Sequence, residues 1–304
     1  MSVFNIAHAN IGGQSQDDEQ EYLQAAGGDE ANAGKSVYGE QKQSARENKK
    51  MKNIPGKGIS RDGIPKRDEN APNALIDLTD YYNAGLIGTW QTVESVSPAE
   101  LKTLTNDLCE LPQGIQTFDG VHFDIRGVVQ LQGGAMKKEG AEYPASVKDI
   151  PIGQSIEQFH TLHATSWQAP HGTHIGTYVM HYENGDSHEL NIIYGKHLLD
   201  WWRYKQEIFE PENTVVAWTG SNELAKPIVR YQRGNMKAKI RSIVESVAAM
   251  NATPILDGRD AAQNPIRLFK TSWNNPHPER KVNSIDYVSE MTDCAPFLVA
   301  LTVE

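Results

Sequence analysis

The N-terminal quarter of the chain limits its fold more than any other feature. Residues 1 to about 73 are too polar and too rich in Gly to bury a core of their own. Ordering a backbone costs about 1–2 kcal/mol per residue, and a segment that buries little apolar surface does not recover that cost by itself. We therefore expect an extended, low-complexity arm over residues 1–73 that becomes ordered by docking on a partner. A solvated linker is the alternative interpretation.

The charges of this arm are segregated along the sequence. Residues 17–30 contain six acidic and no basic side chains, whereas residues 35–67 contain ten Lys and Arg against three acidic residues. Such a pattern is typical of a segment that lies over surfaces of different sign, or over anionic lipid headgroups. We expect the basic residues Lys49, Lys50 and Lys52 to contact the partner.

Composition excludes several classes of protein. The chain has 304 residues and a formal net charge of -10, which argues against nucleic acid as the main partner. Its first residues lack the basic and apolar runs of a secretory signal, and no stretch approaches the roughly 18 apolar residues of a membrane helix. We expect a cytoplasmic protein, or one peripheral to a membrane complex. Two cysteines, Cys109 and Cys294, are too few for a disulfide framework.

Beyond Asn73 the pattern changes to short apolar runs separated by turns. The clearest unit is a hairpin, in which residues 175–182 and 189–194 flank the turn dipeptide Asn184-Gly185. Other expected strands cover residues 121–131, 214–218, 266–273, 284–289 and 297–303. Strands at this spacing predict a mainly β domain over residues 74–304, built as an antiparallel β-sandwich of the jelly-roll kind.

One segment has a helical period. Residues 235–250 carry apolar side chains three and four positions apart, which predicts an amphipathic helix within an insertion at about residues 225–264. An apolar stripe of this kind is covered either by its own domain or by another chain. The candidate partner-binding residues of the stripe are Met236, Ile240, Ile243 and Val247, with Val244 beside them.

Several segments carry a resemblance to a known family. They are residues 114–131, 176–185, 217–222, 267–276 and 284–289, with Tyr194-Gly195 and Asp200-Trp201-Trp202. Together they resemble a poorly characterised bacterial β-sandwich family, similar to jelly-roll carbohydrate-binding modules and common in multidomain proteins of planctomycete-like and verrucomicrobial bacteria. The resemblance spans about residues 75–304 and implies a jelly-roll architecture, but no settled ligand. The arm and the insertion at residues 225–264 depart from the family pattern.

Aromatic side chains suggest a sugar site. Trp201 and Trp202 offer flat apolar faces on which sugars stack, and Asp200 and Asn274 could hydrogen-bond hydroxyl groups beside them. These four residues are the candidate glycan-binding site. Tryptophan is also an ordinary core residue of a sandwich, so burial of the rings is the alternative.

Catalytic signals are weak. The histidines between His160 and His188 are spaced for opposite faces of a strand and lack a known metal-ligand pattern. The carboxylates Asp119, Asp124, Asp200 and Asp286 could supply a glycosidase pair, but the sequence does not bring any two together. Gly-x-Ser-x-Gly, phosphate-binding loops and Cys-x-x-Cys are missing from the sequence. We therefore predict no catalytic residue, no metal and no cofactor.

These observations favour a non-enzymatic accessory subunit that docks through its arm onto a larger protein assembly. The expected partners are protein subunits, with an anionic membrane surface or a glycan as alternatives. An extrinsic subunit of a bacterial membrane complex, such as a photosynthetic reaction-centre or antenna complex, fits this description. The alternatives are a carbohydrate-binding module with a flexible tether and a glycoside hydrolase-like enzyme.

Overall fold

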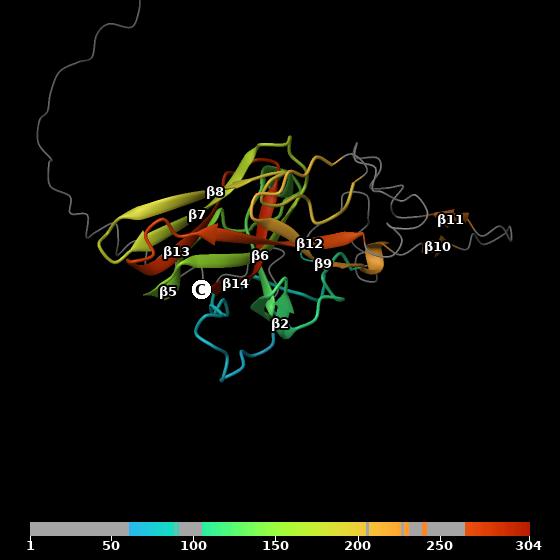
Figure 1. Ribbon diagram of the computed structural model, residues 1–304. Helices are drawn as coiled ribbons and strands as arrows, with labels where there is room; N and C mark the ends of the chain where they lie inside the picture. Colours follow the sequence, from blue (N-terminus) through green and yellow to red (C-terminus); the bar gives the residue numbers. More distant parts are fainter. Residues whose placement is uncertain are drawn as a thin grey trace, which may run out of the picture. The chain divides into compact units, whose positions relative to one another are not determined.

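The computed structural model describes residues 61–88, 90, 105–204, 207–225, 228–230, 239–241 and 265–304. This part of the chain is mainly β and its sheets are antiparallel, as predicted (Figure 1). Most of the arm, including Lys49, Lys50 and Lys52, lies outside the described residues. No helix among the described residues is long and apolar enough to cross a membrane.

The larger sheet has six strands. Their spatial order is β1 (Ala84–Gly85), β4 (Gly127–Gln130), β14 (Ala295–Val303), β6 (Gln158–Ser166), β12 (Ile266–Asn274) and β9 (Thr214–Gly220). All residues of β14 are buried, because β4 and β6 flank it and both faces of the sheet are covered there. This position explains why residues 297–303 form a nearly continuous apolar run.

The smaller sheet has four strands, in the order β5 (Ser146–Ser155), β13 (Lys281–Ser289), β7 (His174–Tyr182) and β8 (Ser187–Ile193). Strands β7 and β8 pair antiparallel around the Asn184-Gly185 turn, so the predicted hairpin is confirmed. Gly185 has a φ of 90°, a left-handed conformation that a glycine adopts without steric cost.

Strands early in the domain pair with strands late in the domain in a nested order. Strand β7 pairs with the next strand β8, whereas β6 pairs with β12, β5 with β13, and β4 with β14. Each outer pair therefore encloses the inner pairs in sequence, as in a long hairpin that has been rolled up. Two further pairings, β14 with β6 and β13 with β7, join these hairpin pairs into the two sheets.

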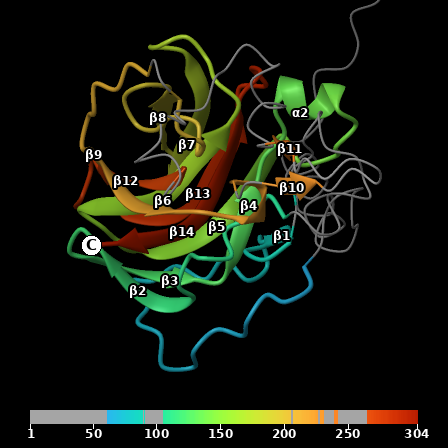
Figure 2. The ribbon, with the colours of Figure 1, turned by 90° about the vertical axis from the view of Figure 1, so that its right-hand side faces the viewer.

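Aromatic rings connect the two sheets, whose strands are labelled in Figure 2. The Tyr178 ring on β7 lies 5.7 Å from Phe159 of β6 and 5.6 Å from Trp273 of β12, measured between ring centroids. It also stacks on Tyr287 of β13 at 4.9 Å. Phe159 and Trp273 belong to the larger sheet, and Tyr178 and Tyr287 belong to the smaller one. The fully buried Tyr178 is thus a central contact between the layers.

Smaller elements surround these sheets. A hairpin of β2 (Gly114–Phe118) and β3 (Val121–Ile125) turns at Asp119-Gly120, where both residues have positive φ. Helix α2 covers Gly134–Lys138 and a 3-10 turn covers Glu223–Ala225. The hydroxyl of Thr302 on β14 donates a hydrogen bond to the backbone carbonyl of His122 at 2.6 Å. The β2–β3 hairpin is thereby attached to the larger sheet.

The predicted helix over residues 235–250 is not present where the structure describes that segment. Lys239–Arg241 form strand β11, which pairs antiparallel with β10 (Ile228–Arg230). The β-branched residues of this stripe suit a strand as well as a helix, so periodicity alone did not decide between them. Of the stripe, Ile240 lies in β11, whereas Met236, Ile243 and Val247 lie outside the described residues.

Candidate functional site

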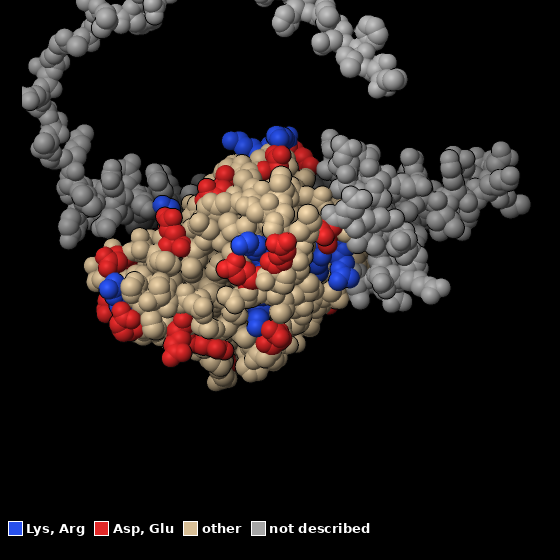
Figure 3. All heavy atoms as spheres, turned by 45° about the horizontal axis from the view of Figure 1, so that its top comes forward, with Lys and Arg blue, Asp and Glu red and all other residues tan. Residues whose placement is uncertain are grey.

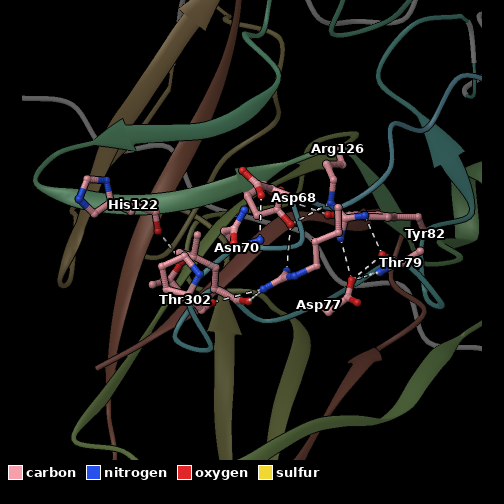
Figure 4. Close-up of polar contacts among 12 residues, drawn as sticks. Asp68, Asn70, Asp77, Thr79, Tyr82, His122, Arg126 and Thr302 are labelled. Carbon is pink, nitrogen blue, oxygen red and sulfur yellow. Dashed lines mark hydrogen bonds and ion pairs between the residues drawn. The ribbon is translucent and has the colours of Figure 1, made fainter.

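The root of the N-terminal arm is attached to the domain by an ionic network that is centred on the buried Asp124 and Arg126 (Figure 4). Arg126 directly follows β3 in the sequence, and its side chain is almost fully buried. Its guanidinium lies 2.8 Å from the Asp124 carboxylate and 2.7 Å from the Asp77 carboxylate. Arg67 contacts the same Asp124 oxygen at 3.0 Å. Thr79 accepts a further hydrogen bond from Arg126 at 2.6 Å. The network therefore joins the segment around residues 67–79 to the chain that follows β3.

Burial and ion pairing set the charge states in this network. Burial works against ionisation of Asp77, but hydrogen bonds from Thr79 and the ion pair with Arg126 outweigh it, so the pKa of Asp77 is lowered. The Arg126 guanidinium also lies over the Tyr82 ring, 5.4 Å from its centroid. Charged groups withdrawn from water are tolerated only when each has partners, as these have.

Backbone pairing continues the same attachment. Leu75 forms an antiparallel bridge with Thr302 of β14, and the Ile76 N–H donates to the Leu301 carbonyl at 2.9 Å. Arg61 donates to the Thr79 carbonyl, and Ile64 packs against the core. Residues 61–73, which we assigned to the arm, therefore contact the domain. Among the described residues, contacts with the domain begin at Arg61, thirteen residues before the predicted boundary at residue 74.

An open groove of about 550 Å³ lies beside this root. It is formed by residues 67–77 on one side and by residues 151–154 of β5 on the other. Three of its lining residues are carboxylates: Asp68, Glu69 and Asp77. None of the predicted glycan-binding residues contributes to it.

The predicted glycan site is not assembled as an exposed platform. Trp201 is 1% exposed, and its ring lies 5.4 Å from Trp90 and 6.0 Å from Phe297 between centroids. Trp202 is partly buried and packs against the same core. Asp200 is 2% exposed. Both tryptophans therefore belong to the core: Trp201 is fully buried in it, and Trp202 packs against it.

Asn274 is separated from these three residues by the length of a strand. Trp202 bridges to Ile266 at one end of β12, whereas Asn274 is the last residue of that strand. Eight residues of strand span about 26 Å at about 3.3 Å per residue. The exposed Asn274 instead accepts a hydrogen bond from Gln158 at 2.8 Å. The four residues predicted as one site therefore belong to two places.

Asp200 is the centre of a buried polar cluster. Its carboxylate accepts hydrogen bonds from the Trp202 backbone at 2.9 Å and from the Tyr204 hydroxyl at 3.3 Å. Arg267 donates to the Asp200 carbonyl and forms a two-pronged ion pair with Glu207. Burial raises the pKa of Asp200 to about 7, although the Trp202 hydrogen bond and Arg267 act in the opposite direction. The carboxyl is thus enclosed, and Arg267 of β12 links the Asp200 backbone and Glu207 to that strand.

A second buried cluster surrounds His163. Its Nε2 lies 2.8 Å from the Thr271 hydroxyl, and its Nδ1 lies 3.3 Å from the Tyr178 hydroxyl. Burial lowers the pKa of His163 to about 3, and the nearby His197 adds to the effect. Burial likewise lowers the pKa of His197 to about 4. Both imidazoles are neutral at pH 7 and serve as polar links inside the domain.

Three other histidines of this region each lie beside a different carboxylate. His181 contacts Asp286 at 3.1 Å, His171 contacts Glu210 at 3.6 Å, and His174 contacts Glu290 at 3.8 Å. Lys270 contacts Asp119 at 2.6 Å. Within the described residues no three His, Cys, Asp or Glu side chains form a group suited to a metal ion.

One group escaped the sequence analysis. Ser272 and Glu304 both lie against His160, although they are far from it in the sequence. The pairing of β12 and β14 with β6 brings them together. A local motif search does not detect such a group, because its signal is strand register rather than spacing.

No family model, curated protein or solved structure matched the chain. The resemblance to a bacterial β-sandwich family therefore stays a prediction.

Trp201 offers a direct test of the core assignment. Replacing a fully buried Trp with Ala typically costs about 3–5 kcal/mol of unfolding free energy, and we expect Trp201→Ala to fall in that range. The partly exposed Trp202→Ala is the matched control and should cost less. Urea unfolding of the full chain measures both. A Trp201→Ala variant with unchanged stability and a lost affinity for a polysaccharide would restore the glycan site.

Asp200 predicts an unusual pH dependence. Its pKa is about 7 in the folded chain against an ordinary 3.8, so the folded state binds the proton more tightly. The stabilisation is complete below pH 4 and is lost as pH rises through 7, a change of about 4 kcal/mol. Asp200→Asn should remove this dependence. Because His163 titrates in the opposite sense, the difference between variant and wild-type unfolding free energies across pH 4–8 isolates Asp200. Parallel curves would contradict the assignment.

Proposed function

We propose that the chain is an accessory subunit that docks through its N-terminal arm onto a larger protein assembly. The observation that supports this best is the ionic root of the arm. Arg67 and Arg126 converge on one buried carboxylate, Asp124, and fix the segment that follows the arm. A flexible tether has no need of such a fixed point, whereas an arm that positions a domain on a partner does.

Charge supports the same reading. Residues 31–60 contain seven Lys and Arg against two acidic residues, whereas residues 61–304 contain 31 acidic against 22 basic residues. Figure 3 shows a face of the domain on which carboxylates are prominent and several lack a basic neighbour in view. The domain is repelled by anionic surfaces, while the basic part of the arm is attracted to them. The arm is therefore suited to an acidic patch of a partner subunit or to anionic lipid.

The finer architecture fits a jelly roll. Nested pairing of β4–β14, β5–β13, β6–β12 and β7–β8 is the pattern of a rolled-up hairpin of eight strands, and jelly rolls are double sheets of eight strands. Strands β1 and β9 extend the larger sheet at its two edges. We therefore propose a jelly roll as the arrangement of the two sheets. In this proposal the jelly roll is the rigid body to which the arm is attached.

The two alternative functions have less support. A carbohydrate-binding module would use the tryptophan pair, but Trp201 packs on Trp90 and Phe297. A glycoside hydrolase would use two converging carboxylates, but Asp124 pairs with arginines and Asp286 with His181. The host assembly, for which a bacterial membrane complex such as a photosynthetic one is our candidate, stays a prediction from the charge of the arm.

Removing the arm tests the proposal. We expect a chain that begins at Arg61 to fold with the melting temperature of the full chain, because the contacts that fix the root begin there. In the native host, the full chain should migrate on a native gel within a larger assembly, and the shortened chain should migrate at its own mass. A full-length variant with Lys49, Lys50 and Lys52 changed to Gln is the charge control. Undiminished assembly of the shortened chain would contradict the proposal.

A vesicle assay separates the two kinds of anionic partner. If lipid is the docking surface, the full chain should sediment with vesicles that contain anionic lipid, and this binding should weaken as salt rises. If a protein subunit is the partner, assembly should persist in the absence of lipid.

A further inference from the structure

A polar row crosses three strands on one face of the larger sheet. In the register of the sheet, His160 of β6 lies opposite Ser272 of β12 on one side and Thr302 of β14 on the other. These strands lie side by side (Figure 2). Phe159 packs inward against Tyr178, and successive side chains of a strand point to opposite faces. His160 and its row therefore lie on the outer face of this sheet.

Two contacts place His160 between a hydroxyl and a carboxylate. The Ser272 Oγ lies 2.9 Å from His160 Nδ1, and the Glu304 Oε2 lies 3.4 Å from His160 Nε2. A carboxylate beside Nε2 favours the tautomer with the proton on Nε2. In that tautomer Nδ1 has a free lone pair, so the Ser272 hydroxyl donates its hydrogen bond to Nδ1. A hydroxyl that donates to a base with a carboxylate beside it is the arrangement of an activated nucleophile. The contact between Glu304 and Nε2 has an ion-pair distance and is not a hydrogen bond.

The surroundings suit a base that is neutral at pH 7. The side chain of His160 is 4% exposed, and no hydrogen bond satisfies its buried Nε2. Burial lowers the pKa of His160, partly countered by Glu304, and Lys270 on β12 lowers it further. Asp119, at the β2–β3 turn, holds Lys270 in an ion pair. Ser272 is partly exposed, so this residue is not sealed from solvent.

Side-chain amides lie in the next row. Asn274 is two residues beyond Ser272 on the same face of β12, opposite Gln158 of β6. Gln158 donates a hydrogen bond to Asn274 at 2.8 Å. Asn and Gln side chains are among the groups that stabilise an oxyanion in acyl transfer. Neighbouring positions on one face of a sheet are about 7 Å apart, within reach of a small ligand that is attached to Ser272.

We propose that Ser272 is a nucleophilic serine that accepts acyl groups from small esters, with His160 as its base and Glu304 as a positioning residue. In the first step the Ser272 Oγ forms a bond to the carbonyl carbon, its proton passes to His160 Nδ1, and the ester C–O bond breaks as the alcohol leaves with that proton. Water then attacks the acyl carbon, gives a proton to His160, and releases the acid as the proton returns to Ser272. This site is independent of the docking arm.

Labelling with a fluorophosphonate tests the nucleophile. The Ser272 Oγ would bond to phosphorus while fluoride leaves, and mass spectrometry of the full chain would locate the adduct on Ser272. We expect Ser272→Ala to abolish this label, whereas Ser155→Ala, at an exposed serine at the end of β5, should leave it unchanged. Loss of the base in His160→Gln should slow labelling roughly 10²–10⁴-fold. An absent adduct, or one elsewhere in the chain, would overturn the proposal.

The pH profile separates a positioning role of Glu304 from a structural one. Labelling of the wild type should rise with pH through the lowered pKa of His160 and then level off. Glu304→Gln should slow labelling. It should also move the midpoint of the pH profile to lower pH, because the Glu304 carboxylate raises the pKa of His160 and the variant lacks it. Glu304→Asp should retain part of the rate. An unchanged midpoint in Glu304→Gln would show that this carboxylate does not act on His160.

A thiol at position 272 keeps the proposal testable if His160→Gln fails to fold. In a Cys109→Ala background, the thiol of Ser272→Cys should be alkylated by iodoacetamide with an apparent pKa below the ordinary value of about 8.5. Adding Glu304→Gln should change that apparent pKa. A thiol that titrates at the ordinary value in both variants would indicate a purely structural Ser272–His160 pair.

Discussion

The buried ion pair between Arg126 and Asp124 connects the parts of the structure that matter most for the proposed function. Asp124 belongs to β3, and the Arg126 guanidinium reaches from the same strand region to Asp77 in the segment that follows the arm. Arg67 adds a second cation to the same carboxylate. Removal of one partner from a buried ion pair typically costs about 3–5 kcal/mol, because the other charge is left uncompensated. The root of the arm is therefore held at a defined point.

This attachment affects how the asymmetric charge distribution could orient the domain on a partner. A basic segment on a freely jointed tether would raise the local concentration of the domain near an anionic partner without orienting it. A basic segment that emerges from a fixed root limits the positions that the domain can take relative to the partner. In the proposed docking, repulsion would keep the rest of the acidic domain away from the anionic region. Orientation rather than affinity is the expected contribution of the root.

The sequence predicted the strands better than it predicted the contacts between them. The β7–β8 hairpin was identified because its turn, Asn184-Gly185, is encoded locally. The inward position of Trp201 was not, since it depends on Trp90 and Phe297, which are distant in the sequence. The segment with Lys239–Arg241 was misread because β-branched residues fit both periods. Arg67 was assigned to a polar arm because its partner, Asp124, is distant in the sequence. Ser272 lies beside His160 only because of the register between β12 and β6.

Hydrogen exchange of the full chain tests the anchored root most directly. In Arg126→Met, amides of residues 61–82 should exchange faster than in the wild type, including the Ile76 amide that donates to Leu301, while amides of β7 and β13 keep their protection. Arg280→Met, which breaks a surface ion pair with Asp186, should leave residues 61–82 unchanged. Unaltered exchange in this segment of Arg126→Met, or equal acceleration throughout both sheets, would contradict the account.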